Sequence, residues 1–199
     1  SPELIAEPYT GPRERLPLLS WFTPSGWRAR YQRMLAGIKS MYGLAICQRH
    51  IEGFSVRTFK ADVIDLYQRV NTLIAEGSLT LLKRDVTGKC FSLMKREMKG
   101  RERAKWAKVT WELSEPLALS NVEVLQSRLL ALDPNNTKTH FAQITVRLQS
   151  QQRFAAYDKR GAKVAGDPAT DVVVEDIWVV ERAVYNPEGR WVLAARLTV

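Results

Sequence analysis

Residues 139–157, THFAQITVRLQSQQRFAAY, decide the fold class of this chain. Apolar side chains occupy every second position in the middle of this stretch: Ala142, Ile144, Val146 and Leu148. Such alternation is typical of a β-strand with one buried face. The residues that follow predict turns at 158–161, 166–168 and 186–189, and strands at 172–185 and 190–199. The C-terminal part of the chain therefore predicts one continuous antiparallel ladder, and nothing in it is typical of catalysis.

The first half of the chain shows helical periodicity instead. Apolar residues recur there at steps of three and four, and they predict helices at 26–50, 56–75, 79–86 and 89–99. Ser25 is the expected N-cap of the first helix, and strands are expected at 106–113 and 121–132. Helices followed by hairpin-linked strands predict an α+β fold, with N-terminal helices packed on one side of a curved antiparallel sheet.

The predicted domain organisation is an arm followed by one domain. Residues 25–199 form the α+β domain, with a helical half at about 25–100 and a sheet at about 105–199. Residues 1–24 contain five of the nine prolines, which predicts an extended arm. A disordered terminus and an arm that lies on a partner surface both remain open. Apolar residues favour docking: Leu16, Leu18, Leu19, Trp21 and Phe22.

The first predicted helix carries a long apolar stripe. Its members are Trp27, Tyr31, Met34, Leu35, Ile38, Met41, Tyr42 and Ile46. Such a stripe is most often the face that covers a core, and we expect that here. The alternative is an interfacial helix on anionic lipid, which Trp27, Tyr31 and Met34 would contact. Gly37 and Gly43 weaken a helix, so we also expect something to pack closely against them.

The net charge of +9 is unevenly distributed. Residues 1–60 and 61–110 each carry a net charge of +5, whereas residues 111–199 carry −1. A basic helical half joined to a nearly neutral sheet indicates a polyanionic partner that contacts one side of the molecule.

The strongest local charge lies in residues 95–108, with a net charge of +5. Its cations are the expected RNA-binding residues: Lys95, Arg96, Lys99, Arg101, Arg103, Lys105 and Lys108. Such a segment can neutralise several phosphates, and Trp106 within it could stack on an unpaired base. A solvated basic face with Trp106 in the core is the alternative. Weaker candidates on the same half are Arg28, Arg30, Arg33, Lys83, Arg84 and Lys89.

Several classes of protein find no support in the sequence. Cys47 and Cys90 lack CxxC spacing, and with two histidines there is no credible zinc set, so we expect buried thiols and no metal or cofactor. No apolar run is long enough for a membrane span, and no signal-peptide core opens the chain, although a cleaved segment before Ser1 would leave no trace. The ionisable residues that could serve as a general acid or base form no recognisable catalytic constellation: Asp62, Asp65, Tyr67, His140 and Asp158.

Three short strings carry a family resemblance. They are FAQITVRL at residues 141–148, YDKRG at 157–161 and NPEGRW at 186–191. They resemble the family of the mitochondrial large-subunit ribosomal protein forty-five and the related fungal inner-membrane ribosome receptors. More loosely, GDP at 166–168 and DIW at 176–178 are similar to the C-terminal domain of the forty-four kilodalton tether of the mitochondrial import motor. The resemblance covers roughly residues 55–199 and is most specific after residue 139.

The resemblance implies a nuclear-transport-factor-like cone and a role without catalysis. For the ribosomal branch it implies a position near the polypeptide exit of the large subunit, in the mitochondrial matrix and peripheral to the inner membrane. The implied partners are ribosomal RNA, neighbouring large-subunit proteins, the inner membrane or its insertase, and the nascent chain. The alternatives are a matrix-side adaptor of the import motor and a small-molecule-binding or enzymatic cone-fold protein.

Overall fold

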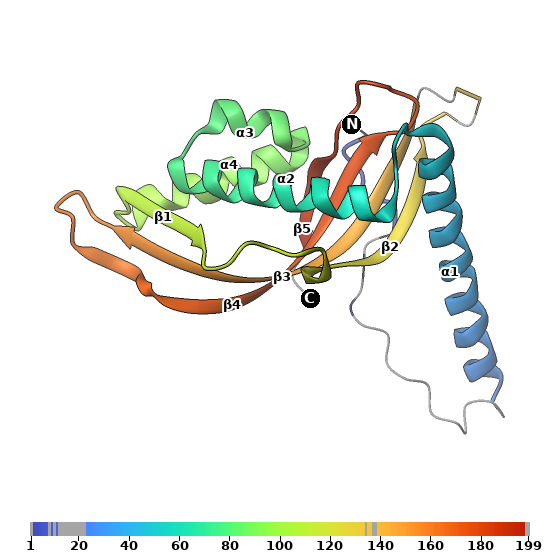
Figure 1. Cartoon of the computed structure of the whole chain (residues 1–199), viewed down its shortest axis with the longest axis horizontal. Helices are drawn as coiled ribbons and strands as arrows, with labels where there is room; N and C mark the ends of the chain where they lie inside the picture. Colours follow the sequence, from blue (N-terminus) through green and yellow to red (C-terminus); the bar gives the residue numbers. More distant parts are fainter. Residues whose placement is uncertain are drawn as a thin grey trace.

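The computed structural model describes residues 2–7, 9, 11, 23–133, 135, 136 and 139–197. Within these residues, helices precede strands, which confirms the α+β class (Figure 1). The helices are α1 (Pro24–His50), α2 (Val56–Glu76), α3 (Leu79–Asp85) and α4 (Gly88–Arg103). A 3-10 turn η2 (Leu119–Asn121) joins β1 (Lys108–Leu113) to β2 (Val122–Ala131), and β3 (His140–Tyr157), β4 (Lys163–Ala183) and β5 (Val192–Leu197) follow.

β3 is the organising strand of the antiparallel sheet. Its N-terminal half pairs with β2 and its C-terminal half pairs with β1, on the same side. On its other side β3 pairs with β4 over most of its length, and β5 pairs with the end of β4. The long β3–β4 hairpin extends past the helices and bends at its tip toward the side of the sheet that carries them (Figure 1). The predicted antiparallel pairing and the curvature of the sheet are therefore confirmed.

The second predicted turn of this ladder is wrong. β4 begins at Lys163, so residues 166–168 lie inside the strand rather than in a turn. Gly166 has φ of +69°, and a Cβ there would lie 2.2 Å from the carbonyl oxygen of Phe154. Only glycine tolerates that approach, and the pairing register shifts beside it, between Gln152 and Phe154. The glycine marks an irregularity of the strand and not its beginning.

The core lies between the helical layer and one face of the sheet. α2 begins at Ser55, whose side chain forms a reciprocal capping box with Thr58, and it ends at Gly77 in the left-handed conformation. Its apolar face is fully buried: Phe59, Val63, Leu66, Tyr67 and Val70. Opposite it lie the predicted inner residues of β3, together with Trp178 and Val180 of β4. The apolar face of α2, with its helical period, thus packs against the apolar face of β3, with its strand period, in one core.

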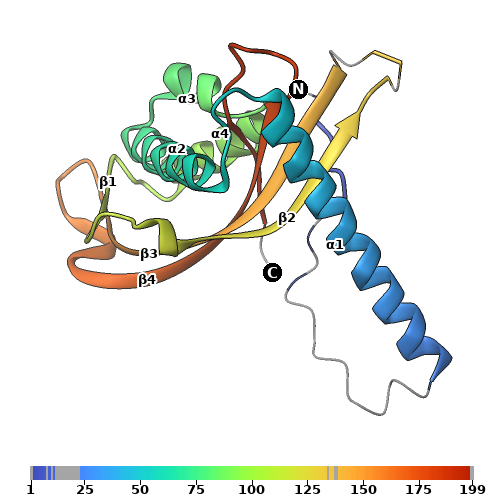
Figure 2. The ribbon, with the colours of Figure 1, turned by 45° about the vertical axis from the view of Figure 1, so that its right-hand side comes forward.

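α1 lies against the edge of the sheet and does not cover the core (Figure 2). Thr23, not Ser25, is its N-cap, since the Thr23 hydroxyl accepts a hydrogen bond from the Gly26 amide. Ser40 Oγ accepts a hydrogen bond of 2.8 Å from the Ser127 amide on the outer edge of β2. At Gly43 the helix approaches the same residue so closely that a Cβ would lie 2.5 Å from its hydroxyl oxygen. Close packing is confirmed at this glycine.

The expectation that the apolar stripe of α1 covers the core is wrong. Its side chains are exposed by 37–73 %: Trp27, Tyr31, Met34, Leu35, Ile38, Met41 and Tyr42. Ile46 alone of the stripe packs against the core cluster, and Gly37 has no neighbour within 4 Å of a Cβ position. The physical reason is that small residues face β2 instead, because they let the helix backbone approach the strand.

The described part of the predicted arm lies on the chain's own sheet. Gln143 accepts a hydrogen bond from the Ala6 amide and donates one to the Leu4 carbonyl. The Glu7 carboxylate pairs with Lys39 of α1 at 2.6 Å and with Arg128 of β2 at 2.7 Å. The apolar residues 16–22, on which the docking interpretation depends, lie outside the described residues. The start of the arm thus ties α1 to the sheet.

Candidate functional site

The basic segment places most of its cations on the solvent side of α4. Cys90 and Met94 hold the opposite side of this helix in the core. Exposed cations follow along and just beyond the helix: Lys95, Arg96, Lys99, Arg103, Lys105 and Lys108. We call these six residues the α4 basic face. Gly100 does not end the helix as expected, because α4 continues to Arg103. Four of the six cations therefore share one helix, whereas Lys105 lies in the turn after it and Lys108 begins β1.

Arg101 differs from the other cations of this segment. Its guanidinium donates a hydrogen bond of 2.6 Å to the carbonyl oxygen of Ile74, near the end of α2. Desolvation lowers the pKa of Arg101, which fits a half-buried guanidinium. Arg101 therefore adds a hydrogen bond to a carbonyl oxygen at the end of α2 that also accepts one of 3.3 Å from the Gly77 amide. Arg101 fixes α4 to α2, and Glu97 fixes α4 to the sheet through an ion pair of 2.6 Å with Arg196.

Trp106 is engaged inside the protein. Its ring lies 5.7 Å from that of Phe154 on β3, at an angle of 55°, and the residue is half-buried. The turn between α4 and β1 has Lys105 at φ +59°, after which the Ala107 amide donates to the Tyr157 carbonyl. The structure thus favours the packing interpretation of Trp106 over base stacking.

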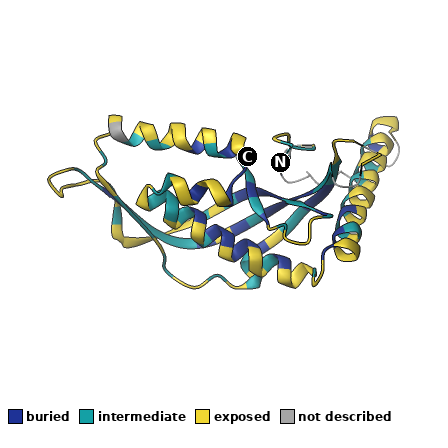
Figure 3. Ribbon diagram, turned by 90° about the horizontal axis from the view of Figure 1, so that it is seen from above, coloured by how far each residue is buried: buried dark blue, intermediate teal, exposed yellow. Residues whose placement is uncertain are grey.

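The weaker RNA candidates do not join the α4 basic face as one surface. Arg30 and Arg33 are half-buried on α1, which lies at one end of the molecule, apart from α4 (Figure 3). Lys89 is exposed in the first turn of α4, while Lys83 and Arg84 are exposed on α3. The structure therefore separates the predicted cations into a compact set on α4 and scattered residues elsewhere.

α1 presents the second candidate surface. Seven exposed apolar residues form what we call the α1 apolar face: Trp27, Tyr31, Met34, Leu35, Ile38, Met41 and Tyr42. The helix contains no Asp or Glu, and its cations are Arg28, Arg30, Arg33, Lys39 and Arg49. An apolar face on a purely cationic helix is typical of binding to an anionic interface. None of the helices in the described residues is both long and apolar enough to cross a membrane.

Sequence reasoning missed four members of this face, Leu35, Ile38, Met41 and Tyr42, as candidate contacts. A signal for their exposure was present. Small residues recur along α1 at helical spacing, on the side that meets β2: Ala36, Ser40, Gly43 and Cys47. The Ala36 carbonyl accepts from Arg128, and Cys47 is fully buried. A stripe of small residues can replace a stripe of large ones as the packed face wherever backbones approach closely.

The ionisable residues considered for catalysis are dispersed. Tyr67 lies in the core, where its hydroxyl donates to Asp176 at 2.6 Å and contacts Ser150. His140 contacts the Tyr185 ring edge to face at the start of β3, and Asp158 accepts amide hydrogen bonds within the β3–β4 turn. The structure brings none of these three together. Asp62 and Asp65 lie on the exposed side of α2.

Comparison with known proteins gives a consistent result. The family described as "Tim44-like domain" matches residues 41–197. The chain is 25 % identical over 172 residues to large ribosomal subunit protein mL45 of Drosophila melanogaster, which covers 86 % of the chain and 45 % of the relative. It is 25 % identical over 174 residues to mL45 of Bos taurus, which covers 87 % of the chain and 53 % of the relative. It is 24 % identical over 187 residues to mL45 of Xenopus laevis, which covers 94 % of the chain and 57 % of the relative. The chain thus spans about half the length of the curated relatives it matches.

Proposed function

Because the chain belongs to the Tim44-like domain family, we propose that it is a non-catalytic component of the mitochondrial large ribosomal subunit. It lies near the polypeptide exit, binds ribosomal RNA and holds the ribosome at the inner membrane. The relatives named large ribosomal subunit protein mL45 support the ribosomal part of this proposal. The observation that carries the tethering part is the separation of two different surfaces, the α4 basic face and the α1 apolar face (Figure 3).

The α4 basic face is the proposed RNA contact. Six exposed cations on one helix and the adjoining strand can neutralise several phosphates and release their counterions. The face has little capacity for reading bases, because Trp106 packs on Phe154. Such a contact fixes position and contributes affinity without sequence readout. Neighbouring large-subunit proteins complete the binding site.

The α1 apolar face is the proposed membrane contact. A fully buried large apolar side chain contributes about 1.5–3 kcal/mol, so seven that are about half exposed offer on the order of 5–10 kcal/mol before opposing costs. Each cation near an anionic surface adds about 1 kcal/mol. Apolar burial and charge attraction act together only on a surface that is both apolar and anionic, as the interface of an anionic membrane is. Nascent chains that leave a ribosome held in this way meet the membrane directly.

Charge reversal on α4 tests the ribosome contact. We expect Lys95→Glu combined with Lys99→Glu to weaken co-sedimentation with large subunits. The slope of the logarithm of the binding constant against the logarithm of the salt concentration should become shallower by roughly one for each phosphate that the variant no longer neutralises. The matched control is Lys159→Glu combined with Arg160→Glu in the β3–β4 turn, which changes the net charge equally at exposed positions. Unchanged co-sedimentation, or an equal effect in the control, would refute the α4 contact.

Flotation with anionic vesicles tests the membrane contact separately. Ile38→Glu combined with Met41→Glu places two charges on the α1 apolar face. We expect this variant to lose vesicle binding while it still sediments with large subunits. The control is Val172→Glu combined with Val173→Glu, at two exposed apolar positions of β4. If the control abolishes flotation as well, or the α1 variant floats normally, α1 is not the membrane contact.

The family description favours one alternative, a matrix-side adaptor of the protein import motor. The two functions predict co-sedimentation with different complexes in a density gradient at moderate salt. A ribosomal component travels with large subunits, whereas an import adaptor travels with translocase components.

A further inference from the structure

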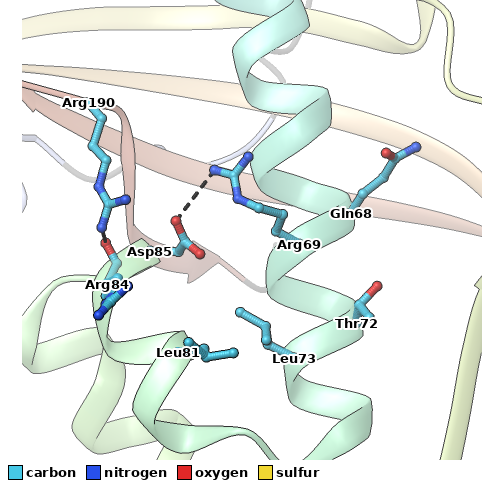
Figure 4. Close-up of a pocket in the computed structure, with 8 residues that line it drawn as sticks. All are labelled: Gln68, Arg69, Thr72, Leu73, Leu81, Arg84, Asp85 and Arg190. Carbon is cyan, nitrogen blue, oxygen red and sulfur yellow. Dashed lines mark hydrogen bonds and ion pairs between the residues drawn. The ribbon is translucent and has the colours of Figure 1, made fainter.

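A groove runs between α2 and α3 on the side of the molecule that neither proposed contact uses. Its cavity measures about 470 Å³ (Figure 4). Six of its lining residues matter here: Arg69 and Leu73 from α2, Leu81, Arg84 and Asp85 from α3, and Arg190 from the segment before β5. Residues far apart in the sequence thus build one concave surface.

Cations exceed carboxylates in this groove. Arg69 forms a long ion pair of 3.4 Å with the buried Asp85, and half of the Arg69 side chain stays exposed. The Arg190 guanidinium donates a hydrogen bond to the Arg84 carbonyl, which holds Arg190 at the groove. The exposed Arg84 side chain makes no ion pair with any residue that the structure describes. Three guanidinium groups therefore face one carboxylate.

Apolar side chains lie directly beside these cations. Leu81 of α3 is 47 % exposed, and Leu73 of α2 is half-buried across from it (Figure 4). A surface that binds only phosphate gains nothing from exposed leucines. A protein segment that carries leucine-like and acidic side chains together would match both features.

The groove continues past Arg69 and Arg190 into a second hollow of about 270 Å³. Arg69 and Arg190 line this hollow together with Arg182, so three arginines face Asp62 and Asp65. Trp191 also lines this hollow, is only 4 % exposed, and its indole N–H lacks an acceptor among the described residues. Buried donors without acceptors are rare in proteins. Cations therefore exceed carboxylates in both hollows, and the leucines lie in the first.

We propose that this groove binds a short amphipathic helix of a partner protein. From Asp62 to Leu73 the groove follows α2 for about 16 Å, which corresponds to roughly three turns of an occupant helix. The occupant carries a leucine-like residue where it meets Leu81, and carboxylates where it meets Arg69, Arg84 and Arg190. The carboxylates of Asp62, Asp65 and Asp85 along the groove disfavour RNA, since carboxylates repel phosphates. The proposal assigns Arg84 to a protein partner and is independent of the α4 contact with RNA.

Fluorescence anisotropy with the full chain tests this proposal. The probe is a labelled fourteen-residue helical peptide with Leu and Glu along one face, and a scrambled peptide of the same composition is the reference. We expect the probe to bind better than the scrambled peptide. Arg84→Glu and Leu81→Glu should each weaken binding about tenfold or more. Lys83→Glu is the matched control, because it reverses the neighbouring exposed charge on α3 outside the groove lining.

Each possible outcome decides the matter. Equal binding of the probe and the scrambled peptide overturns the proposal, as does equal weakening by Lys83→Glu and Arg84→Glu, which would indicate general surface charge. Competition by a single-stranded RNA that Arg84→Glu abolishes and Lys83→Glu does not would assign the groove to nucleic acid instead. Far-UV circular dichroism of each variant checks the fold, and both altered side chains are exposed.

Discussion

Replacing Gly43 by alanine should force α1 and β2 slightly apart and destabilise the protein, because the two elements are in close contact at this position. A methyl group at this position would lie 2.5 Å from the Ser127 hydroxyl oxygen and 3.3 Å from both Cβ and the carbonyl carbon of Ser127. The hydroxyl can rotate away, because it makes no hydrogen bond with the described residues. The two carbon contacts are relieved only if the helix or β2 shifts by a few tenths of an ångström.

Two effects of opposite sign determine the result. Overpacking of a close contact costs about 1–3 kcal/mol, whereas alanine gains about 1 kcal/mol over glycine in a helix interior. Gly37→Ala is the matched control, because a methyl group there meets nothing within 4 Å and only the helical gain remains. We therefore expect Gly43→Ala to be less stable than Gly37→Ala by about 1–3 kcal/mol.

Urea unfolding of the two variants measures this difference, which corresponds to roughly 0.3–1.5 M in the midpoint at an m-value of about 2–3 kcal/mol/M. Ser127→Ala keeps both carbon contacts, so in that background Gly43→Ala should cost about the same. Equal stability of Gly43→Ala and Gly37→Ala would refute the claim that this glycine sets the distance between α1 and β2.

Three further predictions concern the core, the thiols and the arm. Tyr67→Phe leaves Asp176 without its hydroxyl donor and should lower the free energy of unfolding by about 1–3 kcal/mol in urea titrations. Burial raises the pKa of Cys47 and Cys90 to about 11, so at pH 8 only about one thiol in a thousand is ionised. Alkylation at that pH should be slow in the native protein and fast in denaturant, and equal rates would contradict the burial. Hydrogen bonds from Lys39 and then Arg128 lower the pKa of Glu7 from its usual 4.5. The Glu7 contact therefore contributes stability above about pH 4.5 that is lost as the pH falls through the lowered pKa, and the difference in unfolding free energy between wild type and Glu7→Gln should shrink over that range.

Periodicity predicted the elements whose large apolar side chains face the core. α2 and β3 are the clearest examples, because burial on one face forces a period of 3.6 or 2 on the sequence. The same reasoning failed for α1, where the large residues are exposed and the packed face consists of Ser40, Gly43 and other small residues. A hydrophobic pattern indicates which face is apolar, but not what covers it.

The candidate site was predictable only in part for a similar reason. The run of charge in residues 95–108 is local, so the sequence alone located the α4 basic face. The structural role of Arg101 depends on the Ile74 carbonyl, and the packing of Trp106 depends on Phe154, both of which are distant in sequence. The groove between α2 and α3 has no sequence signal at all, since Arg69 and Arg190 become neighbours only in the folded chain.

The orientation of α1 connects stability with the proposed tether. A helix that buries small residues and exposes large ones gains less from folding than the reverse arrangement, because less apolar surface leaves water. The contacts that hold α1 are accordingly specific and polar: Ser40 on the edge of β2, Arg128 on the Ala36 carbonyl, and Glu7 between Lys39 and Arg128. These contacts select one orientation of the helix without covering its apolar face. In the proposed tether, a membrane that covers the α1 apolar face returns the free energy that this orientation forgoes in the isolated chain. Under that proposal, membrane association and the exposed face have one physical origin.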